Sequence, residues 1–404
     1  MILENLSESL HVGEIDPKEL AIIISEVFGQ ASTTNEENVI EYAKNDGSPA
    51  LRLIYDNTGT QIQNVEGTQQ LRLEDIQILR SKIQEELLPN VPAKVGRTIA
   101  FSILPVSGFF RNDQFQICAV PHNPPKPSWG IGGHPLLIEC YYRGSPNTQI
   151  DMHRRVKSLR ELILFLGVVL NHVISEQDKA TRFHWVLTSK DSMSCNYCQE
   201  FYTYEGFSPE AQQFSDVGCL QPLGEMEDSE YFLSRGFSFG EELKLPSSLN
   251  YFTRIFSTLT QRKKDKFLRA AFWYHHATRV YSYSPSASFV SLIFAIEALV
   301  SEETIASSKC EKCQRDVGSG ATRRFINCLE TFAPSKETET AASKKVRKKL
   351  YGIRSHIAHG RDIFQRDASS WIGNFDPEFI GEIRSSCEAS NLARTALLNW
   401  LRMS

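Results

Sequence analysis

Long hydrophobic runs are absent from this 404-residue sequence. Its longest apolar stretch, Leu162 to Leu170, has nine residues, whereas a helix needs about 20 to cross a bilayer. The first 15 residues carry three acidic side chains, no lysine or arginine and no continuous apolar core, so they lack the pattern of a secretory signal. We therefore expect a cytoplasmic protein without a membrane-spanning helix.

An excess of charge of either sign is also missing. The chain has 44 lysines and arginines against 48 aspartates and glutamates, which gives a net charge of −4. Overall charge therefore provides no attraction for nucleic acid, and any such contact must come from a local basic patch. The sequence contains no internal repeat, no low-complexity tract and no Walker A motif, which argues against a solenoid and against a P-loop nucleotide site.

The chain is long enough for two domains with separate cores. Residues 1–244 mix helical and strand-like patterns, which predicts an α+β domain. This domain has no catalytic signature of its own, and we interpret it as a sensor or regulatory domain with an unknown trigger. Residues 121–135 are rich in Pro and Gly and predict an irregular loop. We expect helices at 74–88 and 156–174 and strands at 50–55, 99–104, 115–120, 136–142 and 183–187.

Residues 245–404 predict a second, purely helical domain. It begins near Pro246, where Pro-Ser-Ser precedes a stretch with helical periodicity. The predicted fold class is thus α+β, with a mixed N-terminal domain followed by a C-terminal all-α helical bundle. Helices are expected at 248–259, 264–281, 286–301, 321–332, 337–359 and 377–401.

The helix that ends near Gly360 carries the residues of greatest chemical interest. Arg354 and His359 are five residues apart, hence about 140° apart around the helix. They flank an apolar face with a spacing of three and four, for which burial is predicted: Ala342, Val346, Leu350, Ile353 and Ile357. A structural interpretation also stays open, in which Arg354 is solvated and His359 interacts with the helix C-terminus.

The segment from Arg354 to His359 resembles the R-x(4–6)-H motif of HEPN domains, on the late helix where that family carries it. Residues 286–303, SASFVSLIFAIEALVSEE, are similar to a helix with an apolar-Glu-Ala-Leu-apolar core in the ApeA-like branch of the family. The resemblance covers residues 245–404. It implies a HEPN helical bundle, metal-independent cleavage of RNA, with transfer RNA as one candidate substrate, and assembly into a homodimer. It also implies a role in antiviral or abortive-infection defence.

The residue types suit that chemistry. When a ribose 2′-OH attacks the adjacent phosphate, a histidine can accept or donate the proton near neutral pH. An arginine offers a fixed fork of donors to the phosphate oxygens. The resemblance therefore makes Arg354 and His359 the catalytic candidates, and His356 is a third candidate that either assists or packs. The expected products carry 2′,3′-cyclic phosphate and 5′-OH ends.

A basic stretch contains the motif. Between Lys344 and Arg361 there are seven lysines or arginines and no acidic residue. RNA phosphates would be attracted to such a segment, although a solvated helix face is the alternative interpretation. The candidate RNA-binding residues are Lys344, Lys345, Arg347, Lys348, Lys349 and Arg361.

Nine cysteines are an odd number, which disfavours a secreted disulfide framework. Four of them form two CxxC pairs, Cys195 with Cys198 and Cys310 with Cys313, and together these could give four thiolates to one structural zinc ion. Separate zinc sites and unmetallated thiols are the alternatives. The resemblance implies no catalytic metal.

Three functions are therefore considered. The leading hypothesis is an endoribonuclease that acts as a defence effector. The second is a non-catalytic HEPN module that binds RNA, a nucleotide or a protein partner through the same basic surface. The third is a zinc-sensing or redox-sensing regulator built on the CxxC pairs, whose function would depend on the cysteines and not on His359.

Overall fold

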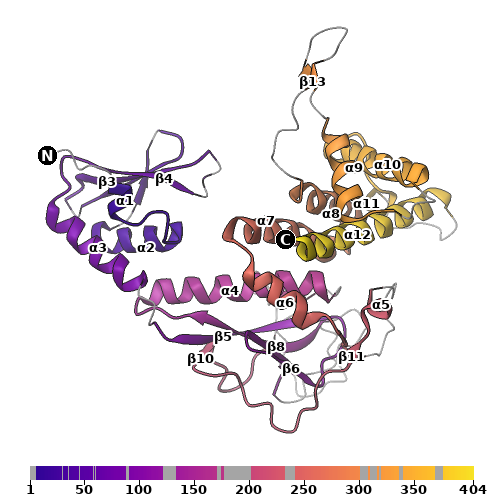
Figure 1. The fold of residues 1–404 in the computed structure, drawn as a ribbon, viewed down its shortest axis with the longest axis horizontal. Coiled ribbons are helices and arrows are strands. Elements are labelled where there is room, and N and C mark those ends of the chain that lie inside the picture. The colour runs from indigo at the N-terminus through magenta and orange to yellow at the C-terminus, as the bar shows by residue number, and fades with distance from the viewer. Residues whose placement is uncertain are drawn as a thin grey trace. The chain divides into compact units, whose positions relative to one another are not determined.

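The fold is mixed α+β, with an N-terminal sheet region and C-terminal helices (Figure 1). At this coarse level the predicted fold class is confirmed. Among the helices that are described, none is both long and apolar enough to span a membrane. The computed structural model describes residues 6–29, 31–34, 36–44, 46–57, 59, 61–87, 91–121, 133–170, 174–176, 202–232, 242–300, 308–309, 316–317, 320–335, 340–368 and 376–404.

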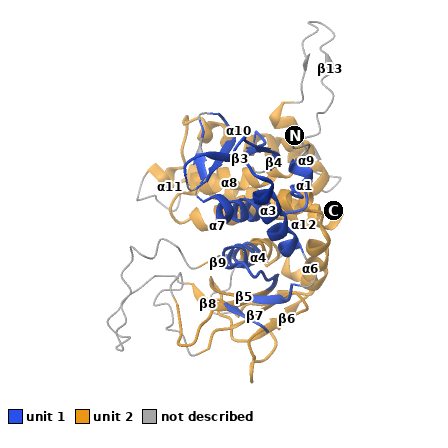
Figure 2. Ribbon diagram, turned by 90° about the vertical axis from the view of Figure 1, so that its left-hand side faces the viewer, with its two compact units in different colours: residues 1–96, 141–158, 210–213 blue, residues 97–140, 159–209, 214–404 orange. Residues whose placement is uncertain are grey.

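The chain forms two compact units (Figure 2). Unit 1 comprises residues 1–96, 141–158 and 210–213, and unit 2 comprises residues 97–140, 159–209 and 214–404. Three elements contribute residues to both units: β5 (Ala93–Ser102), β8 (His134–Arg143) and α4 (Thr148–Val169). Unit 2 thus combines strands with the C-terminal helices, and a domain boundary after residue 244 stays a prediction.

Unit 1 contains a four-stranded antiparallel sheet of order β1-β2-β3-β4. Helix α2 begins where the sequence requires it, because the side chain of Asp16 accepts a hydrogen bond from the backbone N–H of Lys18 and Pro17 occupies the first turn. Apolar residues of the helices and the sheet share one core. The elements are α1 (Leu6–Ser9), α2 (Pro17–Phe28), β1 (Ala31–Thr33), β2 (Val39–Ala43), β3 (Pro49–Tyr55), β4 (Ile62–Gly67) and α3 (Leu73–Leu87).

A six-stranded sheet has the order β10-β5-β8-β7-β6, with β9 also paired to β5. Its strand β8 is buried along most of its length, and the apolar run at residues 136–140 is interrupted by Glu139, which is buried and paired with Arg97 at 2.7 Å. Leu136, Ile138 and Cys140 belong to the core that also contains the C-terminal helices. Leu137 belongs to a separate small cluster. The other strands are β6 (Phe109–Arg111), β7 (Phe115–Ala119), β9 (Ile174–Glu176) and β10 (Glu210–Ala211).

The C-terminal helices pack around α8 (Pro285–Ala298), which is apolar on nearly all sides and contacts α7, α9, α10 and α12. Ser284 caps α8 by accepting a hydrogen bond from the N–H of Ala287, and Pro285 fits its first turn. The other helices are α5 (Asp228–Tyr231), α6 (Leu249–Thr258), α7 (Gln261–Val280), α9 (Ala321–Phe332), α10 (Thr340–Ala358), α11 (Gln365–Ala368) and α12 (Pro377–Met403). Two short pairs of strands are β11 (Glu225–Met226) with β12 (Leu245–Pro246) and β13 (Ser308–Lys309) with β14 (Asp316–Val317).

The six helices expected between residues 248 and 401 are confirmed, with ends that differ by a few residues. The strands expected at 50–55, 99–104, 115–120 and 136–142 correspond to β3, β5, β7 and β8. Helix α4 begins eight residues before the expected start at Val156, because Asn147 caps it by accepting from the N–H groups of Gln149 and Ile150. The strand expected at 183–187 and most of the loop expected at 121–135 lie outside the described residues.

His275 of α7 is a histidine that the fold keeps neutral. Its ring lies beside Gly167 of α4, where a Cβ atom would be 3.5 Å from Nδ1 of His275, an ordinary van der Waals distance. Burial, helped by the positive charges of Arg279 and Arg160, lowers the pKa of His275 to about 4. The imidazole is therefore uncharged at neutral pH.

We expect the stability of unit 2 to fall in mild acid. In the unfolded chain His275 binds a proton near pH 6.5, whereas in the folded chain it does so near pH 4. Its stabilising contribution is complete above pH 6.5 and is lost as the pH falls to 4, so the free energy of unfolding should drop by about 3 kcal/mol.

Urea unfolding followed by tryptophan fluorescence measures this drop, because all five tryptophans lie in unit 2. The His275→Gln variant is the control, since it lacks the titrating group and should lose less stability over the same pH range. An equal loss in both proteins would show that His275 does not cause the acid sensitivity.

Candidate active site

Helix α10 ends within the Arg354 to His359 motif in a Schellman turn. Gly360 has a φ of +65°, and the N–H of Arg361 donates to the carbonyl of His356 at 2.9 Å. The left-handed conformation explains why a glycine follows His359. The side chains of His356 and His359 are both exposed at this helix end, so both imidazoles are accessible to a ligand.

Arg354 lies against α8 and is only partly exposed. Its Nη2 donates to Oε2 of Glu297 at 2.9 Å, in an ion pair whose side chains are 21% and 24% exposed. Its Cζ lies 5.0 Å from the ring centroid of Phe294 and 5.5 Å from that of Tyr351. Arg354 Nε is buried and has no hydrogen-bond partner among the described residues. The guanidinium is therefore fixed on one side and accessible on another.

Glu297 joins the two sequence segments that carry the HEPN resemblance. It is the glutamate of the apolar-Glu-Ala-Leu core, and it accepts hydrogen bonds from Arg354 and from the hydroxyl of Tyr351, the latter at 3.1 Å. Burial and the charge of Glu297 raise the pKa of Tyr351, so the hydroxyl keeps its proton and donates. Sequence reasoning did not name Glu297 as a site residue, although its segment was singled out.

Arg354 and His359 face different directions from α10. At 100° per residue, Lys345, Lys348 and Lys349 lie within about 80° of His359 around the helix, whereas Arg354 lies about 140° from it. Those three lysines are exposed, while Arg354 turns toward α8. One chain therefore presents its arginine and its histidine on separate sides of the helix.

The buried face of α10 differs from the predicted one. Ala342 and Val346 are exposed, and Val346 retains 40% of its accessible surface. Leu350 is buried as expected, and Tyr351 is buried beside it. The predicted apolar face is therefore packed against the core only in the C-terminal half of α10. In the N-terminal half the buried side chain is that of Arg347.

The candidate RNA-binding residues divide into two groups. Lys344, Lys345, Lys348, Lys349 and Arg361 are exposed, and Lys344 forms a 3.2 Å ion pair with Glu330. Arg347 is only 3% exposed, and its Nη2 donates to the carbonyl of Ala333 at 2.6 Å, where α9 ends. Since the Arg347 guanidinium satisfies a helix terminus, we leave this residue out of the proposed RNA-binding surface.

The metal ligands suggested by the sequence are the four cysteines of the two CxxC pairs. Cys195, Cys198, Cys310 and Cys313 lie outside the described residues, so a zinc site at the CxxC pairs stays a prediction. Within the described ranges, no group of three or more His, Cys, Asp or Glu side chains is arranged to hold a metal ion.

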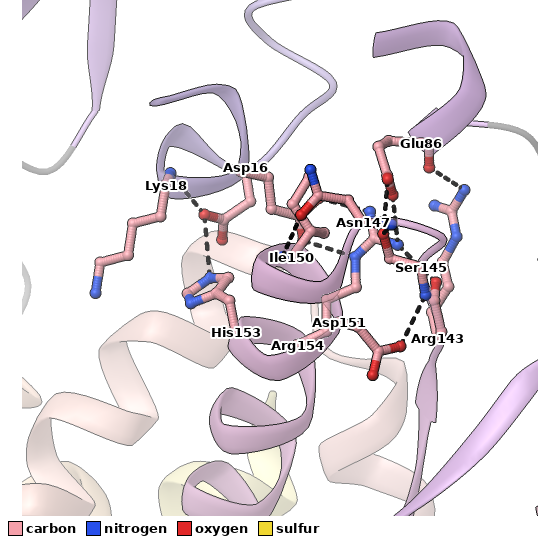
Figure 3. Close-up of polar contacts among 12 residues, drawn as sticks. Asp16, Lys18, Glu86, Arg143, Ser145, Asn147, Ile150, Asp151, His153 and Arg154 are labelled. Atoms are coloured by element: carbon pink, nitrogen blue, oxygen red, sulfur yellow. Dashed lines mark hydrogen bonds and ion pairs between the residues drawn. The ribbon is translucent and has the colours of Figure 1, made fainter. Parts of the chain in front are cut away.

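Unit 1 contains a buried ion network around Arg154 of α4 (Figure 3). The guanidinium donates to the two carboxylate oxygens of Glu19 at 2.8 and 2.6 Å, and its Nη1 lies 3.1 Å from Oε2 of Glu86. All three side chains are buried. Burial opposes the charge of Arg154, but the two glutamates raise its pKa above the ordinary value. The network connects α2, α3 and the N-terminal part of α4.

A pocket of about 360 Å³ adjoins this network in unit 1. Two of its acidic side chains are paired within the protein, Glu26 with Lys82 at 3.1 Å and Glu86 with Arg154. Asn147 also donates to Glu26. Because these charges already have partners, the pocket offers less attraction to an ionic ligand than its acidic lining suggests.

The three residues of the suggested catalytic motif and the exposed lysines thus lie on one helix, and the fold adds Glu297, Phe294 and Tyr351 around Arg354. Arg354 can hold a phosphate on one side of this helix, and His356 and His359 offer imidazoles for proton transfer on another side. Comparison of the chain with protein-family models, with curated proteins and with solved structures finds no match.

Proposed function

We propose that residues 245–404 form a HEPN-type domain that cleaves RNA without a metal ion. The observation that carries this proposal is the ion pair between Glu297 and Arg354. It joins the two segments that resemble the family and leaves the guanidinium partly exposed at the motif. The exposed His359 and a row of lysines on the same helix supply the remaining requirements of the reaction.

The reaction needs two proton transfers and one stabilised charge. The 2′-oxygen of a ribose loses its proton to a base and forms a bond to phosphorus, while the bond from phosphorus to the 5′-oxygen breaks and an acid protonates the leaving oxygen. His359 would serve one proton role, and His356 is the neighbouring candidate for the other. Arg354 would stabilise the negative charge that builds on the phosphate oxygens.

A homodimer would solve the geometric problem of this site. Because Arg354 and His359 lie about 140° apart on α10, a single phosphate cannot contact both from one side of the helix. A second copy, related by a two-fold axis, could place its motif opposite the first, so that each half of the site receives an arginine and a histidine. We include this pairing in the proposal.

The proposed role is that of a defence effector in the cytoplasm. The resemblance to ApeA-like proteins is the support for antiviral or abortive-infection activity, and transfer RNA is one candidate substrate. Residues 1–244 would sense a trigger, since free ribonuclease activity would harm the cell that makes it.

A non-catalytic RNA-binding or protein-binding module is the second candidate. The pairing of Arg354 with Glu297 favours it, because the carboxylate neutralises part of the positive charge that a phosphate would meet. Such a module would bind ligands through the exposed lysines and leave RNA intact.

Cleavage of RNA in the presence of EDTA distinguishes the two candidates. The purified full chain is assayed with and without cell extract, which serves as a source of the trigger. We expect it to cut total cellular RNA and leave 2′,3′-cyclic phosphate ends. A 2′-deoxy substitution at the cut position should block cleavage, because the nucleophile is missing. Cuts that need a divalent metal ion, or that leave 3′-OH ends, would rule out the proposed chemistry.

A further inference from the structure

Aromatic rings form a continuous group beside Arg354. The guanidinium lies over Phe294 of α8, and Phe294 meets Trp273 of α7 edge to face, with 5.0 Å between ring centroids. Phe272 and His276 adjoin Trp273 at 5.4 and 5.9 Å. Helices α7 and α8 lie side by side (Figure 1). We call Phe272, Trp273 and His276 the α7 aromatic face.

The α7 aromatic face is partly exposed to solvent, and the Trp273 ring stands at 71° to Phe272 and at 85° to His276. Phe272 and His276 are one helical turn apart, and their ring planes differ by 13° with centroids 6.1 Å apart. Phe272 is 37% exposed. Trp273 is partly buried against Phe294 and fixes the face to the helical core. Rings held in this way lose little freedom when a further ring stacks on them.

The surroundings of the α7 aromatic face are positively charged. Arg160 lies over Phe272, with its Cζ 5.9 Å from the ring centroid. Arg269 and Arg279 are exposed on the same side of α7 as Phe272. No acidic residue occurs in α7 between Lys266 and Val280. The charge therefore complements a phosphate backbone.

We propose that the α7 aromatic face stacks an unpaired base of the RNA whose phosphate is held at Arg354, so that the substrate is single-stranded. This inference rests on the proposed function. Proteins bind single strands by combining a basic surface with exposed aromatic rings, since every base has a face that can stack. A duplex keeps its bases paired and stacked and cannot use such a surface. Phe294 connects the face to Arg354, because its ring centroid lies 5.0 Å from Arg354 Cζ and 5.0 Å from the Trp273 ring centroid, so one RNA strand can contact both.

Binding of a non-cleavable RNA tests the α7 aromatic face apart from catalysis. The probe is a fluorescein-labelled 12-nucleotide 2′-O-methyl RNA, single-stranded or annealed to its complement, and fluorescence anisotropy is measured with the full chain. We expect tighter binding of the single strand, and a loss of about tenfold in affinity in Phe272→Ala, which removes one stacking ring. Phe272→Tyr should bind as tightly as the wild type. Tyr251→Ala, which removes an aromatic ring that is 50% exposed on α6, should also bind normally.

The outcomes separate this inference from the proposed function. Normal binding by Phe272→Ala, or equal binding of single strand and duplex, would overturn the stacking site even if the protein cleaves RNA. Loss of binding in Phe272→Ala without cleavage by any form would keep the stacking site and reject the nuclease. A change in the sedimentation of Phe272→Ala without a change in RNA affinity would reassign the face to contact between two copies of the chain.

Discussion

RNA cleavage is expected to fall about 10³-fold when Arg354 is replaced by alanine. The guanidinium is the cation that the fold holds beside Phe294 and Glu297, and its charge persists at any physiological pH. Its loss removes the stabilisation of the negative charge that develops on the phosphate. Replacement of His359 by alanine should have a similar effect, because the reaction then lacks a group for proton transfer.

Two conservative variants show whether Arg354 acts through its geometry. Arg354→Lys keeps the charge but loses the fork of donors, so we expect most of the activity to disappear. Glu297→Gln keeps the shape of the carboxylate but weakens its hold on Arg354. If Glu297 positions the guanidinium, this variant should lower kcat at least tenfold and change KM little.

Initial rates on a labelled RNA, together with thermal unfolding, measure these effects. Arg254→Ala removes an exposed arginine of α6 and serves as the matched control, with activity expected to equal that of the wild type. Full activity of a folded Arg354→Ala would contradict the catalytic assignment and with it the interpretation of the motif. If that variant unfolds, Arg354→Lys and Glu297→Gln still decide the matter, because both keep the packing around the site.

The local features of this site were predictable from the sequence. The end of α10 could be placed because a glycine that adopts a positive φ follows a periodic helix. The exposure of His356 and His359 then follows from their position in the last turn. Five of the six basic residues suggested for RNA binding are exposed, since long charged side chains usually remain in water.

Contacts between distant segments were not predictable in the same way. Glu297 and Arg354 are 57 residues apart in the chain, and only the packing of α8 against α10 brings them together. The burial of Arg347 was missed for a similar reason, because its partner is the carbonyl at the end of another helix. The spacing of apolar residues does not reveal a charged residue that is buried because it caps the end of another helix.

Much of unit 1 was also missed. Strand β4 has one buried residue, Val65, among six, so its pattern is weak. Helix α4 carries several charged residues in its first half, and one of them, Arg154, is buried against two glutamates. Hydrophobic periodicity cannot detect a core contact that is made by charges.

Unit 1 should lose about 3–5 kcal/mol of stability when Arg154 is replaced by methionine. Methionine fills much of the space of arginine but leaves Glu19 and Glu86 buried without their cation. Isolated buried carboxylates are strongly disfavoured, and removal of one partner costs more than the net value of the pair. The ends of α2 and α3 that meet α4 should therefore open first.

Hydrogen–deuterium exchange of α2 and α3 is the appropriate measurement, since unit 1 contains no tryptophan. The matched control is Arg155→Met at the next position of α4, where the arginine pairs at 3.1 Å with Glu210, a residue that is 44% exposed. An exposed partner is solvated when the pair is lost, so this control should cost at most about 1 kcal/mol.

Neutralising the glutamates provides the decisive comparison. The triple variant Arg154→Met, Glu19→Gln, Glu86→Gln removes the two buried carboxylate charges that have lost their cation. It should recover part of the protection from hydrogen exchange that Arg154→Met loses. If the cost came only from lost packing, the triple variant would be no more stable than the single one. If Arg154→Met destabilised unit 1 no more than Arg155→Met, the network would not hold the three helices together. The attraction between Arg154 and its glutamates would then be cancelled by the free energy needed to remove the guanidinium from water.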